Sequence, residues 1–418
     1  MFNDPERKPA LVLSGGGAYG AYEVGVIKAL FEGKSRSTFR VPLDPAIYTG
    51  TSVGNYNAAF LAMNEVDALE SINQLHTIWT DRIADNGDGL GNGVYKMRWN
   101  PFNYIDPRVP GSPIELLRRL IGDTTSLGRA AAPRLANLLA PDEGLSERMK
   151  DLFNISAFLN VEPFRRLIED TIKPSALRTS KKILKITATG WLTGIAKEFC
   201  FPNTENEKTW TDEETWAAIR ASAAIPALFP PVKLLNEVYI DGGVVQNTPI
   251  KPAVKACATE LHVVSLNPEM ARLSDGRFEN TLDTFNRVYA AMLVSRIDED
   301  VASAKWVNEG IEALERIALG HNFNLETMRQ FVRVAGVISS RLEKEKELPR
   351  KLTIHRYFPN RSLGDMLGML NFHRRSIDDM IRDGYADTCA HNCDDNKCVI
   401  PAVVEQAQPV EARAASTV

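Results

Sequence analysis

Near the N-terminus, short apolar runs alternate with stretches whose apolar residues recur at helical spacing. Residues 11–13 form an apolar run that ends at Ser14 and three glycines, which is typical of a buried strand followed by a tight turn. The apolar residues that follow at helical spacing are Val24, Ile27, Leu30 and Phe31. A second unit has its strand at 46–49 and its helix at 53–63. The pattern therefore predicts two consecutive strand–turn–helix units.

The alternation continues after a weakly periodic interval. Between 84 and 160, Gly, Pro and Asn are frequent, and we expect an inserted cap over the core there. Downstream, the pattern predicts strands at 183–189, 192–201, 239–240, 262–266 and 353–358, and helices at 214–224, 281–319 and 375–382. Strands that alternate with helices indicate an α/β fold with a mostly parallel sheet flanked by helices. We expect one domain over 1–390 with a helical C-terminal extension, and a disordered tail at 391–418.

The composition is that of an ordinary globular chain of 418 residues, with 44% hydrophobic and 24% charged side chains. These proportions exclude a wholly disordered, collagenous or coiled-coil protein. The 49 basic and 53 acidic side chains leave a formal net charge of −4. A general nucleic-acid binder would show a basic excess, so we expect no nucleic-acid partner.

The cysteine count and the lengths of the apolar runs bear on the compartment. Five cysteines, an odd number, argue against a complete disulfide framework and for a reducing compartment. The first apolar run, 10–13, is too short for a secretory leader, and no run approaches the roughly 18 uncharged apolar residues of a membrane-spanning helix. We therefore expect a cytoplasmic protein whose membrane contact is peripheral.

The most specific motif is Gly50-Thr51-Ser52-Val53-Gly54, between the second predicted strand and its helix. A serine at such a turn adopts a strained conformation, and glycines two positions away on either side relieve the crowding. The turn exposes the hydroxyl at a helix N-terminus, where free amides favour developing negative charge. Ser52 is therefore a candidate nucleophile. The structural alternative is that Ser52 only caps the helix.

The segment from Gly15 to Gly20, Gly-Gly-Gly-Ala-Tyr-Gly, has more than one interpretation. As G-x-G-x-x-G after a strand it could bind a dinucleotide, but that site also needs an acidic residue about 20 positions on, at the end of the next strand. Glu32 and Asp44 do not occupy that position. Consecutive glycine amides can instead form an oxyanion hole, which a nucleophile on the next strand favours. A purely structural glycine turn is the third interpretation.

A serine nucleophile needs a base. The chain has six histidines: His76, His262, His321, His355, His373 and His391. None of them follows a strand in a glycine-rich turn, whereas Asp241 ends a predicted strand and precedes Gly242 and Gly243. An aspartate is a weak base toward a hydroxyl, so positioning and oxyanion donors must contribute more. Asp241 could also be a turn-forming residue, and an acyltransferase or thioesterase with a histidine base is the rival function.

In this order, the three motifs resemble the patatin-like phospholipase family, over about 9–387. The glycine segment lies in LVLSGGGAYGAYEVGVIKAL, the serine in GTSVGNYNAAFLA, and the aspartate in DGGVVQNTPI, after ASAAIPALFPPV. The late stretch FHRRSIDDMIRDGYAD is similar to the closing helix of bacterial members. The resemblance implies helix–sheet layering related to the α/β-hydrolases, with the cap and the C-terminal extension as additions to one catalytic domain.

The resemblance also implies roles for individual residues. Ser52 would be the nucleophile and Asp241 the general base of a Ser-Asp dyad, with the amides of Gly15, Gly16 and Gly17 as the oxyanion hole. The supporting motif glycines are Gly20, Gly50, Gly54, Gly242 and Gly243. The reaction would be hydrolysis of fatty-acyl esters of phospholipids or lysophospholipids through an acyl-enzyme, without a metal or an organic cofactor. The expected partner is a lipid substrate. Many members have Arg or Lys where this chain has Tyr19. We expect this difference to affect anion affinity and catalytic rate more than the type of reaction.

Two weaker features remain. Cys389, His391, Cys393 and Cys398 lie close together, and thiolate–imidazole sets can bind zinc. Their spacing matches no paired C-x-x-C pattern, so free thiols are the expectation and a metal site stays an open alternative. Two arginine-bearing amphipathic pieces, 114–121 and 134–139, could rest on an anionic bilayer or form ordinary half-buried helices.

Overall fold

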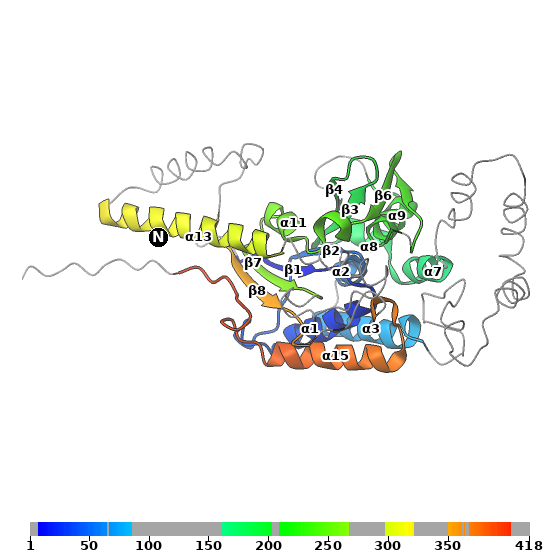
Figure 1. Ribbon diagram of the computed structural model, residues 1–418, viewed down its shortest axis with the longest axis horizontal. Helices are drawn as coiled ribbons and strands as arrows, with labels where there is room; N and C mark the ends of the chain where they lie inside the picture. The colour runs from blue at the N-terminus through cyan, green and yellow to red at the C-terminus, as the bar shows by residue number, and fades with distance from the viewer. Residues whose placement is uncertain are drawn as a thin grey trace, which may run out of the picture.

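A mixed sheet organises the chain in the computed structural model (Figure 1). The structure describes residues 7–64, 67–85, 161–202, 209–226, 228–266, 297–321, 350–361, 363 and 368–402. The strands of this part are β1 (Pro9–Leu13), β2 (Ile47–Thr51), β3 (Ile183–Gly190), β4 (Ala196–Phe201), β5 (Val232–Leu234), β6 (Glu237–Asp241), β7 (Glu260–Val264) and β8 (Thr353–Tyr357). Their order is β5-β6-β3-β2-β1-β7-β8, with β4 also paired to β3.

The predicted mostly parallel α/β sheet is confirmed. Strands β3, β2, β1, β7 and β8 run parallel to one another. Strands β4 and β6 pair antiparallel with β3, and β5 pairs antiparallel with β6. The connection between β3 and β4 spans only residues 191–195, which allows a hairpin but not the crossover that a parallel pair needs.

Helices cover both faces of the sheet. They are α1 (Gly20–Phe31), α2 (Val53–Met63), α3 (Ala68–Ile78), α7 (Glu162–Thr171), α8 (Pro174–Thr179), α9 (Asp212–Ser222), α10 (Gly243–Gln246), α11 (Ile250–Lys255), α13 (Ile297–His321) and α15 (Arg374–Cys389). Short turns of other helix types are η1 (Gly17–Tyr19), η2 (Trp79–Ile83) and η5 (Gly368–Leu370). None of the described helices has the length and apolar character needed to cross a membrane.

The alternation of side chains along β1 divides the core in two. Leu11 and Leu13 point into the larger cluster, with apolar residues of α1, α2, α3 and α15. Ala10 and Val12 point to the other face, against α11 and α13. Figure 1 shows α1, α3 and α15 together on one side of the sheet. Because both faces of β1 are covered, its residues form a continuous apolar run rather than an alternating one.

Helix α15 packs closely along α1. A Cβ atom on Gly384 would overlap the Tyr22 carbonyl of α1, and one on Gly25 would overlap the Ile381 carbonyl of α15. The two backbones approach each other where these glycines lie, so the late helix covers the first one. The periodic pattern predicted this late helix for 375–382, and the family resemblance placed a closing helix within 372–387; the structure has it at Arg374–Cys389.

The C-terminal boundary differs from the prediction. Residues 391–402, assigned from sequence to a disordered tail, belong to the packed structure. Val399 pairs antiparallel with Ile354 of the edge strand β8, and the His391 side chain is only 2% exposed. Isolated residues make these contacts, so the segment has no periodic pattern that would reveal them. Residues 403–418, the segments 114–121 and 134–139, and all of the predicted cap except 84–85 lie outside the described residues.

Candidate active site

Ser52 lies in the sharp turn between β2 and α2. Its backbone has φ 52° and ψ −125°, in the left-handed region that residues with a Cβ seldom adopt. Such a conformation costs about 1–3 kcal/mol and persists only where the surrounding structure enforces it. The Ser52 side chain makes no capping hydrogen bond to α2, so the interpretation as a helix cap is not supported.

The two glycines of the pentapeptide lie where the backbone has no room for a side chain. A Cβ on Gly50 would lie 2.5 Å from the Asn55 Cα, and one on Gly54 would lie 2.6 Å from the Ser14 carbonyl oxygen. The tight turn therefore excludes larger residues at both positions. The close packing of the Ser52 turn against the end of β1 explains the spacing of the motif.

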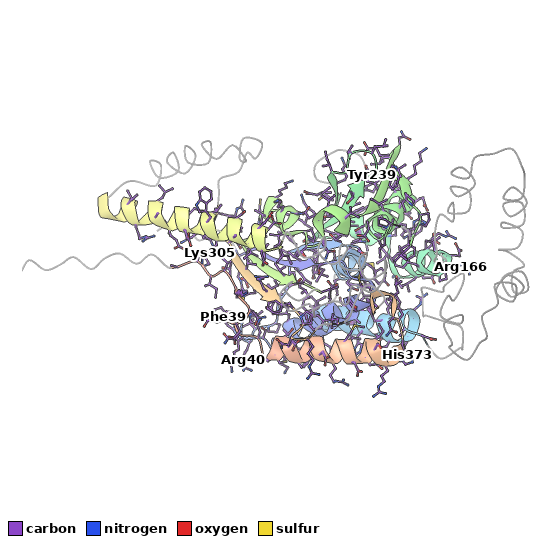
Figure 2. The ribbon with its side chains drawn as sticks, viewed as in Figure 1. Phe39, Arg40, Arg166, Tyr239, Lys305 and His373 are labelled. Atoms are coloured by element: carbon purple, nitrogen blue, oxygen red, sulfur yellow. The ribbon has the colours of Figure 1, made fainter. Side chains whose placement is uncertain are left out.

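Strand register brings Asp241 next to Ser52 although they are far apart in the chain. Thr51, the residue before Ser52, pairs with Thr187 of β3. The next residue of β3, Ala188, pairs with Asp241 at the end of β6. Tyr239, labelled in Figure 2, lies two residues earlier on the same strand. Ser52 and Asp241 thus lie at the same level of the sheet, on either side of β3, where β2 and the antiparallel strand β6 both end.

The Asp241 carboxyl group is buried and only partly satisfied. Its Oδ1 accepts a hydrogen bond of 2.7 Å from the Gly243 amide. Its Oδ2 is buried and accepts no fully formed hydrogen bond. Burial raises the pKa of Asp241 to about 7, while hydrogen bonding from the Ser52 hydroxyl and the Gly243 amide opposes that rise. The Ser52 hydroxyl is therefore close enough to interact with the carboxylate, in a geometry that is loose in the absence of a substrate.

Ser222, at the end of α9, hydrogen-bonds with the Ser52 turn, with β3 and with Gly242, the residue after Asp241. Its hydroxyl accepts a hydrogen bond of 3.0 Å from the Ser52 amide and donates one of 2.6 Å to the Thr187 carbonyl. The backbone carbonyl of Ser222 accepts a hydrogen bond of 3.3 Å from the Gly242 amide. Sequence reasoning placed Ser222 in the aspartate segment without a role, because no local pattern signals these distant contacts.

The glycine loop lies beside Ser52. A Cβ on Gly15 would lie 2.9 Å from the Ser52 Cβ. The Gly15 amide is already occupied, because it donates to the side-chain oxygen of Asn247 at 3.1 Å and to its carbonyl at 3.3 Å. The amides of Gly16 and Gly17 have no acceptor among the described residues. Two of the three predicted donors are therefore free, and Asn247, which sequence reasoning missed, holds the third.

Apolar residues close the space in front of Ser52. The cavity next to Ser52 and Gly17 has a volume of about 10 Å³, room for roughly one water molecule. Its other lining residues are Val53, Ala223, Ile225, Phe229, Met369, Leu370 and Phe372. Tyr19, at the position noted above, is buried against η5, and its hydroxyl occupies the space where a Cβ on Gly368 would lie.

The histidines contribute little to this site. The five whose side chains are described are His76, His262, His355, His373 and His391. His262 hydrogen-bonds with Glu260 and Tyr357, and both His355 and His391 contact Cys393. Within the described part of the chain, none of the five hydrogen-bonds to Ser52 or Asp241. A histidine base therefore has no support there.

Comparison with known proteins assigns the family. The family model for patatin-like phospholipases matches residues 11–254, more than half of the chain. The chain belongs to the patatin-like phospholipase family. The match includes the glycine loop, Ser52 and Asp241. The family is named for phospholipases, enzymes that cleave carboxylic esters of lipids.

Two further comparisons add little to this assignment. A search of curated protein sequences found no significant match. Among solved structures, the crystal structure of VipD from Legionella pneumophila is similar, with a TM-score of 0.35 and 14% sequence identity. The alignment covers 92% of this chain and 66% of VipD, so the chain spans slightly less than two thirds of that protein.

The raised pKa of Asp241 predicts a pH-dependent stability difference. The folded protein keeps the Asp241 proton up to about pH 7, whereas the unfolded chain releases it near 3.8. Stability is therefore lost as pH rises from about 3.8 to about 7, by up to roughly 4 kcal/mol in total, and this contribution is constant above that range. We expect Asp241→Asn to unfold at higher denaturant concentration than wild type at pH 8, with the gap narrowing toward pH 5. The measurement is the free energy of unfolding at each pH.

The control for this measurement is Asp44→Asn, which removes a carboxylate whose side chain is 79% exposed. A gap between wild type and Asp241→Asn that stays constant from pH 5 to 8 would contradict the prediction.

Proposed function

We propose that this protein is a serine hydrolase that cleaves fatty-acyl esters of phospholipids or lysophospholipids through a Ser52–Asp241 dyad. The observation that supports this most directly is a strained serine next to a buried carboxyl group, which keeps one oxygen without a hydrogen bond and whose pKa is lowered by the serine hydroxyl. Membership of the patatin-like phospholipase family supports the lipid ester as the substrate class.

In the first half of the proposed reaction, Asp241 accepts the Ser52 proton as the serine oxygen attacks the ester carbonyl. The free amides of Gly16 and Gly17 donate to the oxyanion of the tetrahedral intermediate. The N-terminus of α2, directly after Ser52, favours the same negative charge. The carbon–oxygen bond of the ester then breaks, the alcohol leaves with the proton from Asp241, and Ser52 keeps the acyl group.

Deacylation repeats these steps with water. Asp241 accepts a proton from the water molecule, the hydroxide adds to the acyl carbonyl, and the Ser52 oxygen leaves with the proton. An exposed aspartate would be a poor base for this work. Burial raises the pKa of Asp241 to about 7, which brings its basicity closer to that of a histidine at neutral pH.

The described state has no room for an acyl chain. A cavity of about 10 Å³ cannot hold even a few methylene groups. Met369, Leu370 and Phe372, from η5 and the residues after it, line the cavity together with Ile225 and Phe229, from the segment after α9, so separation of these two groups would open an apolar slot. Substrate entry therefore requires η5 and its neighbours to move away from the glycine loop.

An exposed apolar hairpin lies near the same end of the sheet. In the connection between β3 and β4, Trp191 is 54% exposed, Leu192 is 92% exposed and Ile195 is 66% exposed. Trp191 is three residues beyond Ala188, the partner of Asp241, which is roughly 10 Å along a strand. Exposed aromatic and aliphatic groups at this distance suit insertion into a lipid surface that presents the substrate. Peripheral membrane contact through this hairpin is part of the proposal.

Ser52→Ala and Asp241→Asn should each lower ester hydrolysis by about 10⁴-fold or more, because each removes a group that acts in the reacting unit. The measurement is fatty-acid release from a mixed panel of phospholipids and lysophospholipids. A fluorophosphonate probe should label Ser52 in wild type, and peptide mapping should find no label in Ser52→Ala. Ser303→Ala, on the exposed face of α13, is the control. Undiminished turnover in either variant, or labelling at another serine, would refute the dyad.

The pH profile offers a separate check on the base. Because only ionised Asp241 accepts a proton, kcat/KM on a soluble short-chain ester should rise with pH, with a midpoint near the pKa of about 7. Ionisation of a carboxyl group has a small enthalpy, so the midpoint of the pH profile should hardly shift between 10 and 35 °C. A midpoint that moves strongly with temperature would indicate an imidazole base instead.

Replacing both Trp191 and Leu192 with serine should weaken sedimentation with phosphatidylcholine vesicles at least about tenfold, because each side chain contributes roughly 1.5–3 kcal/mol when buried in an apolar phase. Hydrolysis of a soluble short-chain ester should not change. The matched control is Trp306→Ser, because Trp306 on α13 is 69% exposed but lies outside the hairpin. Equal vesicle binding by the hairpin variant and the control would rule out this surface.

A further inference from the structure

Four metal-binding side chains converge at the edge of the sheet that is formed by β8. His355 lies on β8, and His391, Cys393 and Cys398 lie in the segment after α15. One ligand atom from each residue lies within 4.8 Å of all the others. Both histidines are buried, and both cysteines are partly buried. We name this set the edge cluster. It includes neither Ser52 nor Asp241.

The distances in the edge cluster match the edges of a metal-centred tetrahedron. The Cys393 Sγ lies 3.6 Å from the His355 Nδ1 and 3.5 Å from the His391 Nε2, and the Cys398 Sγ lies 3.5 Å from the His391 Nε2. With zinc–sulfur bonds of about 2.3 Å and zinc–nitrogen bonds of about 2.0–2.1 Å, a tetrahedral site separates sulfur from nitrogen by about 3.6 Å. The side chains therefore need little rearrangement to enclose an ion.

We propose that His355, His391, Cys393 and Cys398 bind one Zn²⁺ ion in a closed structural site. Two thiolates and two imidazoles form a donor set that zinc prefers, and four protein ligands leave no open position for a substrate. Two thiolates also balance the charge of the ion. A neutral complex is compatible with a buried location, where an uncompensated charge would be costly.

The backbone around the cysteines supports the sulfur ligands. The Arg356 amide, next to His355, donates to the Cys398 Sγ at 3.4 Å, as outer-shell donors do to ligating thiolates. The Cys398 amide donates to the Cys393 carbonyl at 2.9 Å, which closes a turn between the two cysteines. The Asn396 side chain donates to the Arg356 carbonyl at 3.0 Å and holds this turn against β8.

The imidazoles are placed by contacts of a different kind. The His355 ring stacks on the ring of His262, with centroids 5.2 Å apart, and His262 is the partner of His355 across β7 and β8. The His391 Nδ1 is buried without a hydrogen-bond partner, and the two cysteine sulfurs contact the other ring nitrogen, Nε2, so no hydrogen bond on Nδ1 holds its proton there. Coordination through Nε2 would do so, because the metal occupies that nitrogen and leaves the proton on Nδ1.

The sequence interpretation of the same region differs in two positions. It grouped Cys389 with the other three residues, but Cys389 ends α15 and is not part of the edge cluster. The fourth ligand is His355, which lies 36 residues before His391 and belongs to another element. No local spacing could therefore have revealed the set.

An ion at this position would attach the end of α15 to the sheet. The segment after α15 already pairs with β8 through Val399 and Ile354, and the four ligands would add a bond network beside that pair. The proposed role is stabilisation of the late helix, which covers α1, and protection of the edge strand from pairing with other chains.

Zinc content of the full-length chain, purified with a reductant and without chelators, tests the proposal. We expect close to one zinc ion per chain in wild type and in the control Cys389→Ser, and less than about one tenth of that in Cys393→Ser and Cys398→Ser, because a structural site needs all four ligands. Wild type and Cys389→Ser should also lose thermal stability on addition of a zinc chelator. Equal zinc contents in all four proteins would overturn the proposal.

A cobalt titration of the stripped wild-type chain does not depend on the folding of any variant. One equivalent of Co²⁺ should produce the intense visible bands of tetrahedral coordination and a thiolate-to-cobalt charge-transfer band, and Zn²⁺ should abolish both. Absence of these bands from a chain with reduced thiols would overturn the proposal. A Cys393–Cys398 disulfide in the freshly purified, unreduced chain, detected by mass spectrometry, would overturn it as well.

Discussion

Burial of the Asp241 carboxyl group is the constraint on which the candidate site depends. A carboxylate placed at a strand end, away from water, is costly to ionise, and its pKa rises to about 7. That cost is useful if the group must accept a proton from Ser52 at neutral pH. One amide and one loosely placed hydroxyl interact with it, so the carboxylate keeps an oxygen available.

Hydrogen bonds between distant elements hold the segments around Ser52 and Asp241 in place. Asn247 holds the glycine loop, Ser222 holds the Ser52 turn, and both connect elements that are distant in sequence. A second buried carboxyl group, that of Glu23 in α1, lies behind the loop and accepts a hydrogen bond from the Asn57 side chain of α2 at 2.9 Å. Burial raises the pKa of Glu23 well above its ordinary value, and the hydrogen bonds from Asn57 and from the Ser14 amide oppose that rise.

The proposed dyad and the edge cluster lie in different parts of the sheet. Strands β2 and β6 end at the proposed dyad, on either side of β3, whereas β8, the outermost parallel strand, carries His355 of the edge cluster. Helix α15 connects these regions, because it packs on α1 near the glycine loop and ends next to the cluster. Stability added at the edge strand can thus support the loop without placing a ligand near Ser52.

The sequence by itself determined the strand–turn–helix units and the parallel-rich fold class, because local periodicity leaves a clear pattern. It also indicated Ser52 and Asp241 as candidates, through the steric demands at Gly50 and Gly54 and through a carboxylate at a predicted strand end. Only the tertiary structure decided that Asn247 occupies the Gly15 amide, that residues 391–402 pack on β8, and that His355 rather than Cys389 completes the edge cluster. These contacts join residues from separate elements, and strand order and register, which no local pattern encodes, determine which side chains meet.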